Sequence, residues 1–150
     1  MDSNSPFEKR PALESFDHDE APGAAEVVES LGAEIEARFA PRDETPLAIL
    51  ARDGTGALLG GLDGASHWRW LYVRRLWVAP AQRGRGLGGR LLEEAEASAR
   101  ARGCVGVYID TFDASAAAFY ERRGFARVGV IADFPPGHER IFLSKPLAAG

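Results

Sequence analysis

The sequence predicts a mixed α/β (α+β) fold built on one sheet that contains antiparallel and parallel strands. Three features predict it: a hairpin pattern over residues 46–61, a strand–helix–strand run over residues 67–110, and a second hairpin pattern over residues 128–144. Antiparallel neighbours need only a short turn, whereas parallel neighbours need a crossover connection. The first half of the chain is therefore expected to be antiparallel, and the middle to supply one parallel crossover.

The composition limits the kinds of partner that the chain is expected to have. Its 150 residues are 45% hydrophobic, which fits one globular domain with a core, and a net charge of -4 gives no general attraction for nucleic acid. Cys104 is the one cysteine, so no disulfide forms within the chain. No apolar run reaches the roughly 18 residues that span a bilayer. We expect a cytoplasmic protein without nucleic-acid, membrane or metal partners. A homodimer is compatible with the sequence.

The N-terminal quarter of the chain shows the weakest secondary-structure pattern. Residues 1–22 are polar and rich in proline, so we expect them to be weakly ordered, apart from a short strand near residues 12–16. Apolar residues at helical spacing predict a helix over residues 24–39, which Pro41 ends. One domain is therefore expected over residues 23–150.

The next segment alternates between strand and turn signals. Strands are predicted over residues 46–52 and 57–61, on either side of the turn sequence at residues 53–56. Asp63-Gly64 predicts a second turn, and a long third strand is expected over residues 67–78. These segments make up the antiparallel part of the sheet.

Aromatic side chains follow period two along the third strand. Trp68, Trp70 and Tyr72 are expected to share one face, where they form either part of the core or the wall of an acceptor pocket suited to a cationic or apolar amine. Arg74 and Arg75 then interrupt the apolar pattern, which predicts a β-bulge.

The second half of the chain predicts the crossover and the final hairpin. A helix ended by Gly103 is followed by a continuous apolar run, which is typical of a strand buried on both faces. Asp113 is placed to cap a short helix. The expected elements are a helix over 88–102, a strand over 104–110, a helix over 114–123, and strands over 128–132 and 140–144 joined by a turn at 135–137.

A glycine-rich loop over residues 82–89 separates the third strand from the helix that follows. Glycines allow the backbone to approach a ligand, and the helix N-terminus adds a partial positive charge. Arg83 and Arg85 add longer-range attraction, so a pyrophosphate is the ligand that the loop suits best. The alternative is a solvent-exposed turn with a helix cap.

The loop also fits a dinucleotide-binding pattern. Gly84-x-Gly86-x-x-Gly89 matches the glycine spacing, and Asp110 lies about twenty residues beyond. However, the remaining residues contain one crossover and a hairpin, not the repeated βα units of a dinucleotide fold. A nicotinamide- or flavin-dependent oxidoreductase is therefore disfavoured but stays an alternative.

Two motifs together resemble those of the GNAT superfamily of N-acetyltransferases. Residues 76–88 (LWVAPAQRGRGLG) are similar to its coenzyme A motif, and residues 117–125 (AAFYERRGF) to its second motif. One helix and one strand lie between them, as in the family. The resemblance covers about residues 46–145 and does not extend to the N-terminal quarter.

This resemblance implies a GNAT-like fold: a mostly antiparallel central sheet with a V-shaped splay and flanking helices. It implies acetyl-CoA as co-substrate, no metal, and direct acetyl transfer to an amine of a small-molecule or peptide acceptor. Backbone groups near Trp77 and Val78 would bind the pantetheine arm. Asp113 would contact the pantetheine or only cap its helix. The pyrophosphate would be held by the amides of Arg83, Gly84, Arg85, Gly86, Leu87, Gly88 and Gly89.

The resemblance assigns the catalytic acid more firmly than the base. Tyr120 matches the tyrosine that protonates the departing thiolate, although a tyrosine packed for its ring alone is the alternative. The glutamate that many members carry on the strand before the loop is replaced by Arg74 and Arg75. Asp110 is the first substitute, His138 the second, and a chain of waters the third. A non-catalytic acyl-CoA sensor on the same fold stays the alternative function.

Overall fold

A computed structural model describes residues 10–148, which fall into two compact units divided after Pro41. In the first unit, α1 (Ala24–Arg38) confirms the predicted helix, and none of its residues is buried. The strand predicted near residues 12–16 is wrong, because these residues are exposed and have no regular secondary structure. The part of the N-terminal prediction that falls on residues 1–9 lies outside the described residues.

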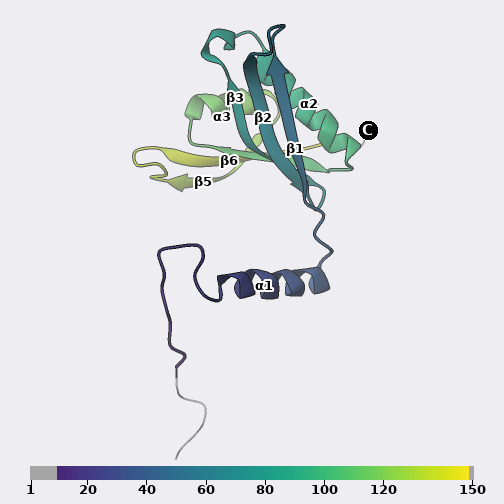
Figure 1. The fold of residues 1–150 in the computed structure, drawn as a ribbon. Coiled ribbons are helices and arrows are strands. Elements are labelled where there is room, and N and C mark those ends of the chain that lie inside the picture. The colour runs from purple at the N-terminus through teal and green to yellow at the C-terminus, as the bar shows by residue number, and fades with distance from the viewer. Residues whose placement is uncertain (1–9, 149–150) are drawn as a thin grey trace, which may run out of the picture. The chain divides into compact units, whose positions relative to one another are not determined.

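The second unit contains a mixed sheet (Figure 1). Its six strands run in the order β1-β2-β3-β4-β6-β5, and β3–β4 is the parallel pair among antiparallel ones. The predicted mixed, mostly antiparallel sheet is thus confirmed. The bounds are β1 (Thr45–Arg52), β2 (Leu58–His67), β3 (Trp70–Val78), β4 (Gly106–Thr111), β5 (Ala126–Ala132) and β6 (Glu139–Pro146).

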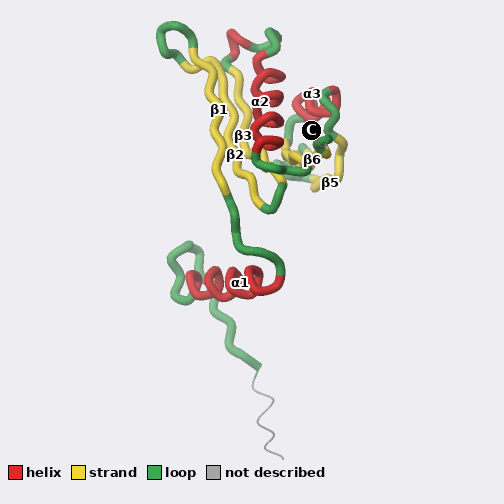
Figure 2. The backbone as a smooth tube through the Cα atoms, turned by 90° about the vertical axis from the view of Figure 1, so that its right-hand side faces the viewer, coloured by secondary structure: helices red, strands yellow, loops and turns green. Residues whose placement is uncertain are grey.

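Two helices share one core with the sheet. Helix α2 (Leu87–Ala101) supplies the crossover between β3 and β4 and runs along the sheet (Figure 2), and α3 (Ala114–Arg122) follows β4. On the central strands, every second residue is apolar and packs on the face that the two helices cover. The core members are Leu71, Val73, Leu91, Leu92, Ala95, Val107, Ile109, Ala117, Tyr120, Phe125, Ile141 and Leu143, among others.

The turn between β2 and β3 lies later than the sequence predicts. Strand β2 continues through Asp63 and Gly64, because a Cβ at Gly64 would collide with the carbonyl oxygen of Tyr72 and glycine lets the two strands approach. The chain reverses at Trp68 and Arg69, with φ values of 47° and 65°. The turn predicted at Asp63-Gly64 is therefore wrong, and Trp68 lies in the turn and not on the third strand.

The predicted bulge is confirmed at Arg74. Asp63 pairs with Arg75 and Gly64 pairs with Val73, which leaves Arg74 as the extra residue on β3. The bulge shifts the alternation by one position, so Val73 and Leu76 both pack on the core. Arg75 forms an ion pair of 2.7 Å with Asp63 on β2.

The β3–β4 pair opens into the V-shaped splay. Their pairing runs from Trp70↔Gly106 to Val73↔Ile109 and stops there, although β3 continues to Val78 and β4 to Thr111. The prediction that the strand over residues 104–110, which is β4, is buried on both faces is wrong. Val107 and Ile109 face the core, whereas Tyr108, on the opposite face, is 41% exposed.

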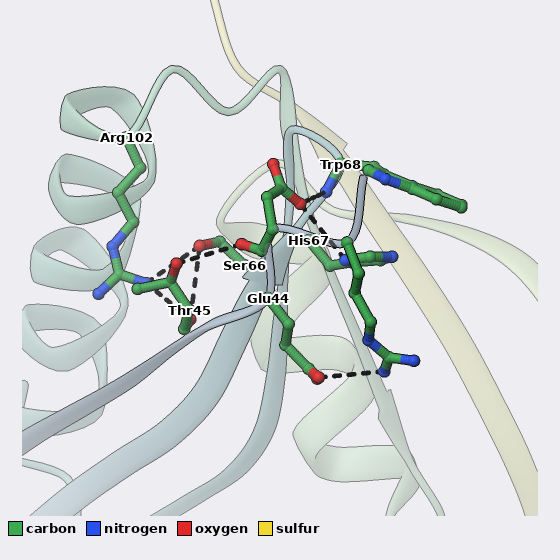
Figure 3. A network of polar contacts seen from close by, with 8 residues as sticks. Glu44, Thr45, Ser66, His67, Trp68 and Arg102 are labelled. Atoms are coloured by element: carbon green, nitrogen blue, oxygen red, sulfur yellow. Dashed lines mark hydrogen bonds and ion pairs between the residues drawn. The ribbon is translucent and has the colours of Figure 1, made fainter. Parts of the chain in front are cut away.

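The end of α2 is tied to the first two strands by a polar network (Figure 3). Arg102, which caps α2, donates hydrogen bonds to the carbonyl oxygens of Thr45 and Pro46 at 2.9 Å and to the hydroxyl of Ser66 at 3.0 Å. Asp43 accepts a hydrogen bond from the backbone N–H of Trp68 at 2.9 Å. The contacts of Arg102 fix the C-terminal end of α2, and the glycine-rich loop precedes its N-terminal end.

Candidate active site

A groove of about 360 Å³ lies at the N-terminal end of α2, beside the open part of the β3–β4 pair. Strand β3, the glycine-rich loop, the first turn of α2 and one side chain of α3 form its walls. They contribute Leu76, Trp77, Val78, Gln82, Arg83, Gly84, Gly86, Leu87, Gly88, Gly89 and Phe119. The groove therefore brings both sequence motifs to one place.

The conformation of the loop leaves backbone donors available. Gly84 and Gly86 have φ values of 74° and 84°, a region that residues with a side chain rarely adopt. Gly86 is the N-cap residue of α2, and no side chain caps this helix. The backbone N–H groups of its first turn are therefore not bonded to a capping side chain. The side-chain Nε of Arg83 donates to the carbonyl oxygen of Val78 at 3.1 Å and ties the loop to the end of β3. This arrangement suits an anion.

Most residues predicted to bind the cofactor line this groove; Arg85 and Asp113 do not. Asp113 caps α3, where one carboxylate oxygen accepts hydrogen bonds from the backbone N–H of Ser115 at 2.8 Å and of Ala116 at 3.4 Å. The side-chain hydrogen bond from Ser115, followed by that from its backbone, lowers the pKa of Asp113. Its contacts in the structure are those of a helix cap.

Tyr120 lies on α3, 5% exposed, with its ring against those of Phe119 and Phe125. Burial raises the pKa of Tyr120 to about 12, and the charges of Asp113 and Asp110 add to the rise. The phenol therefore keeps its proton throughout the neutral range, as a proton donor must.

Asp110 joins three strands on the face opposite the helices. Its carboxylate accepts a hydrogen bond of 2.5 Å from the hydroxyl of Tyr72 on β3 and one of 2.6 Å from Nε of Arg140 on β6. The side chain of Asp110 is 6% exposed, and a second guanidinium nitrogen of Arg140 completes the ion pair. Burial, then the hydrogen bond with Asp110, raises the pKa of Tyr72 to about 12. These contacts favour a role in holding Tyr72 and Arg140 over one in accepting a proton.

The predicted aromatic residues divide into two groups. Tyr72 stacks on Tyr108 with ring centroids 4.8 Å apart, and Trp70 meets Tyr108 edge-on at 6.4 Å. Trp68 instead stacks on His67 in the β2–β3 turn. The structure thus brings together Trp70 and Tyr72, whereas Trp68 lies in the turn between β2 and β3.

The remaining candidates lie apart from this group. His138 is exposed in the turn between β5 and β6, where its carbonyl oxygen accepts from the backbone N–H of Phe134 at 3.0 Å. Cys104 is buried in the core, which raises the pKa of its thiol. Among residues 10–148, no cluster of three histidine, cysteine or acidic side chains could hold a metal ion. No helix in that range has the length and apolar character needed to cross a membrane.

Sequence reasoning missed Tyr108, Arg140, Phe119 and Arg123. Phe119 stands beside Tyr120 in the second motif, so its presence in the groove had a local signal. Arg140 and Tyr108 had none, because their contacts with Asp110 and Tyr72 depend on strand order.

Comparisons with known proteins agree with this geometry. The family model described as the acetyltransferase (GNAT) family matches residues 12–125. An acetyltransferase of Agrobacterium fabrum is 41% identical over 109 residues, which cover 73% of this chain and 80% of that protein. A blasticidin-S acetyltransferase of Streptomyces morookaense is 46% identical over 93 residues, 61% of this chain and 68% of its own.

A crystal structure of an acetyltransferase from Agrobacterium tumefaciens matches with a TM-score of 0.78 and 37% identity. The match covers 93% of this chain and 100% of that one. The two chains therefore share a fold, and this chain belongs to the acetyltransferase (GNAT) family, whose members are acyltransferases that use acetyl-CoA.

Proposed function

We propose that this enzyme transfers an acetyl group from acetyl-CoA directly to the amine of a small-molecule or peptide acceptor. The observation that carries the proposal is the groove, in which the free end of β3 and the first turn of α2 meet. The loop around Gly84 and Gly86 supplies N–H donors for the pyrophosphate. Beyond Val73, no described strand pairs with β3 on the side of β4, so backbone groups near Trp77 and Val78 are placed to bind the pantetheine arm.

Direct transfer needs a fixed geometry and few chemical groups. The amine nitrogen forms a bond to the thioester carbonyl carbon, and the carbon–sulfur bond then breaks. Backbone N–H groups on the open edge of β3 would stabilise the negative charge that develops on the carbonyl oxygen, an effect that contributes about 3–4 kcal/mol in other enzymes. The splay holds the two reactants in line for attack.

Tyr120 is proposed to protonate the departing sulfur. It lies on the same helix as Phe119, which lines the groove. Its raised pKa keeps the hydroxyl protonated until negative charge develops on the thiolate.

Removal of the amine proton is proposed to involve solvent. Asp110 was expected as the base, but its carboxylate is engaged by Tyr72 and Arg140, which supports a positioning role for it. His138 is exposed to water on its turn. We therefore propose water, with or without His138, as the route for this proton.

The competing function is a non-catalytic acyl-CoA sensor. The missing carboxylate at Arg74 and Arg75 favours it, whereas the buried, protonated Tyr120 favours an enzyme. Release of free thiol from acetyl-CoA, measured with a panel of primary amines, separates the two. Because one relative is named for blasticidin S, this antibiotic belongs in the panel. We expect thiol release that needs both protein and amine. Tight binding of acetyl-CoA without release for any amine would contradict the enzyme.

A further inference from the structure

Arg123, at the end of α3, lies against the first turn of α2. A Cβ atom built on Gly89 would fall among the guanidinium atoms of Arg123, so the guanidinium occupies the place of the missing side chain. The guanidinium carbon also lies 5.0 Å from the ring centroid of Phe119. Gly89 and Phe119 both line the groove. The charge of Arg123 is therefore held at the edge of the groove.

This position is electrostatically unfavourable without a ligand. The first turn of a helix carries a partial positive charge, which repels a neighbouring cation. Within residues 10–148, Arg123 forms an ion pair only with Glu93, at 3.6 Å, and the Glu93 side chain is 70% exposed. An ion pair with an exposed partner compensates little, because water screens it. Two positive groups beside one groove create a site for an anion.

We infer that Arg123 binds the pyrophosphate of coenzyme A together with the first turn of α2. The inference rests on the proposed function and adds a residue from the second motif to the phosphate site. A guanidinium can donate two parallel N–H bonds to phosphate oxygens, which a backbone amide cannot. Gly89 then has its own role, distinct from that of Gly84 and Gly86: it leaves room for the side chain of Arg123.

The first test compares three ligands by calorimetry: coenzyme A, dephospho-coenzyme A, which lacks the 3′-phosphate, and pantetheine, which lacks all phosphates. Arg123→Gln should bind both nucleotides about five- to fiftyfold more weakly and pantetheine unchanged, as expected for a charged hydrogen bond. The loss should shrink as salt rises. Arg122→Gln is the matched control, because this neighbour is exposed and Arg123, not Arg122, supplies the guanidinium beside Gly89, so the variant should bind all three ligands as the wild type does.

The second test changes the contact between Gly89 and the guanidinium of Arg123. In Gly89→Ala, the new methyl group displaces the mobile end of Arg123, and the backbone φ at this position allows alanine. This variant should lose affinity in the same range as Arg123→Gln. The double variant Gly89→Ala/Arg123→Gln should bind no more weakly than either single variant, because both changes remove one interaction.

Several results would overturn the inference. Equal affinity of Arg123→Gln and wild type for coenzyme A would do so while leaving the proposed function intact. A loss seen with coenzyme A but not with dephospho-coenzyme A would place Arg123 on the 3′-phosphate. Additive losses in the double variant, or a salt-independent loss accompanied by a lower melting temperature of the free protein, would show a role in packing. A wild-type protein that binds no coenzyme A would overturn both proposals.

Discussion

The two faces of the sheet at the β3–β4 split are built in different ways. On the helix-covered face, most of the groove comes from residues 76–89, which are close in sequence, and Phe119 of α3 adds one side chain. On the opposite face, Tyr72, Asp110 and Arg140 come from three strands and meet through their side chains. The first site is mostly local in sequence, whereas the second depends on strand order.

If the groove depends on backbone conformation, Gly86→Val should have the largest effect on it. A β-branched residue at φ 84° is strained by about 1–2 kcal/mol and would point into the ligand path. We expect acetyl-CoA affinity to fall more than about a hundredfold, which corresponds to about 3 kcal/mol. Calorimetry with the purified variant measures it.

Gly103→Val is the matched control for this change. Gly103 has a similar φ of 76° and open space around it, and it follows α2 at the end remote from the loop. Both variants should lose a similar amount of thermal stability, but only the first should lose affinity. Unaltered binding by a folded Gly86→Val variant would refute the role of the loop.

Tyr120→Phe tests the chemistry next to the groove and should have the second largest effect. It keeps the ring packed between Phe119 and Phe125 and removes the proton. Turnover should fall about ten- to a thousandfold with acetyl-CoA affinity little changed, because the hydroxyl acts only as charge develops on sulfur. An acyl donor with a more acidic thiol should show a smaller loss.

The pH profile gives an independent check on Tyr120. A pKa raised to about 12 means that the phenol stays protonated as pH rises from 7 to about 10, so its titration should cause no loss of rate in that range. An alkaline limb below about pH 10 that is present in the wild type and absent in Tyr120→Phe would contradict this assignment.

The features of each face could be predicted from the sequence where they depend on neighbouring residues, and not where they depend on strand order. The loop and the helix cap at Asp113 could be predicted, because glycine spacing and an N-cap act on residues that are neighbours in sequence. The bulge at Arg74 was also visible as a break in alternation. The contacts of Asp110 could not be predicted, because Tyr72 and Arg140 lie 38 and 30 positions away in sequence and only the sheet brings them together.

The errors have local physical causes. The alternation of Trp68 with Trp70 suggested one strand, but Trp68 and Arg69 adopt positive φ values in a turn without glycine, which composition does not reveal. The apolar run that contains Tyr108 suggested a strand buried on both faces. A tyrosine satisfies an apolar pattern while leaving its ring on an open surface.

Asp110→Asn tests the opposite face and should have an intermediate effect. The amide keeps the shape but removes the charge that neutralises Arg140, which is itself partly buried. We expect a loss of about 1–3 kcal/mol in the free energy of unfolding, less than for a fully buried pair. Denaturant unfolding measures it, and Arg75→Gln, which breaks the exposed pair with Asp63, is the matched control with little expected effect.

The same variant decides the role of Asp110 in catalysis. If Asp110 positions Tyr72 and Arg140, Asp110→Asn should lower kcat/KM while the acidic limb of the pH–rate profile stays where it is in the wild type. Disappearance of that limb, with the fold retained, would instead make Asp110 the base.

His138→Gln should have the smallest effect, and it tests whether either face supplies a base at all. His138 is exposed on the β5–β6 turn, and that turn is held by backbone hydrogen bonds between Phe134 and His138 and between His138 and Pro135. Glutamine keeps both bonds, so the turn should persist. Because water can replace an exposed base, we expect kcat/KM to fall by less than about fivefold, well below the usual contribution of a positioned base. A larger loss that abolishes the acidic limb would assign proton removal to His138, and the base would then lie on a turn and not on the sheet.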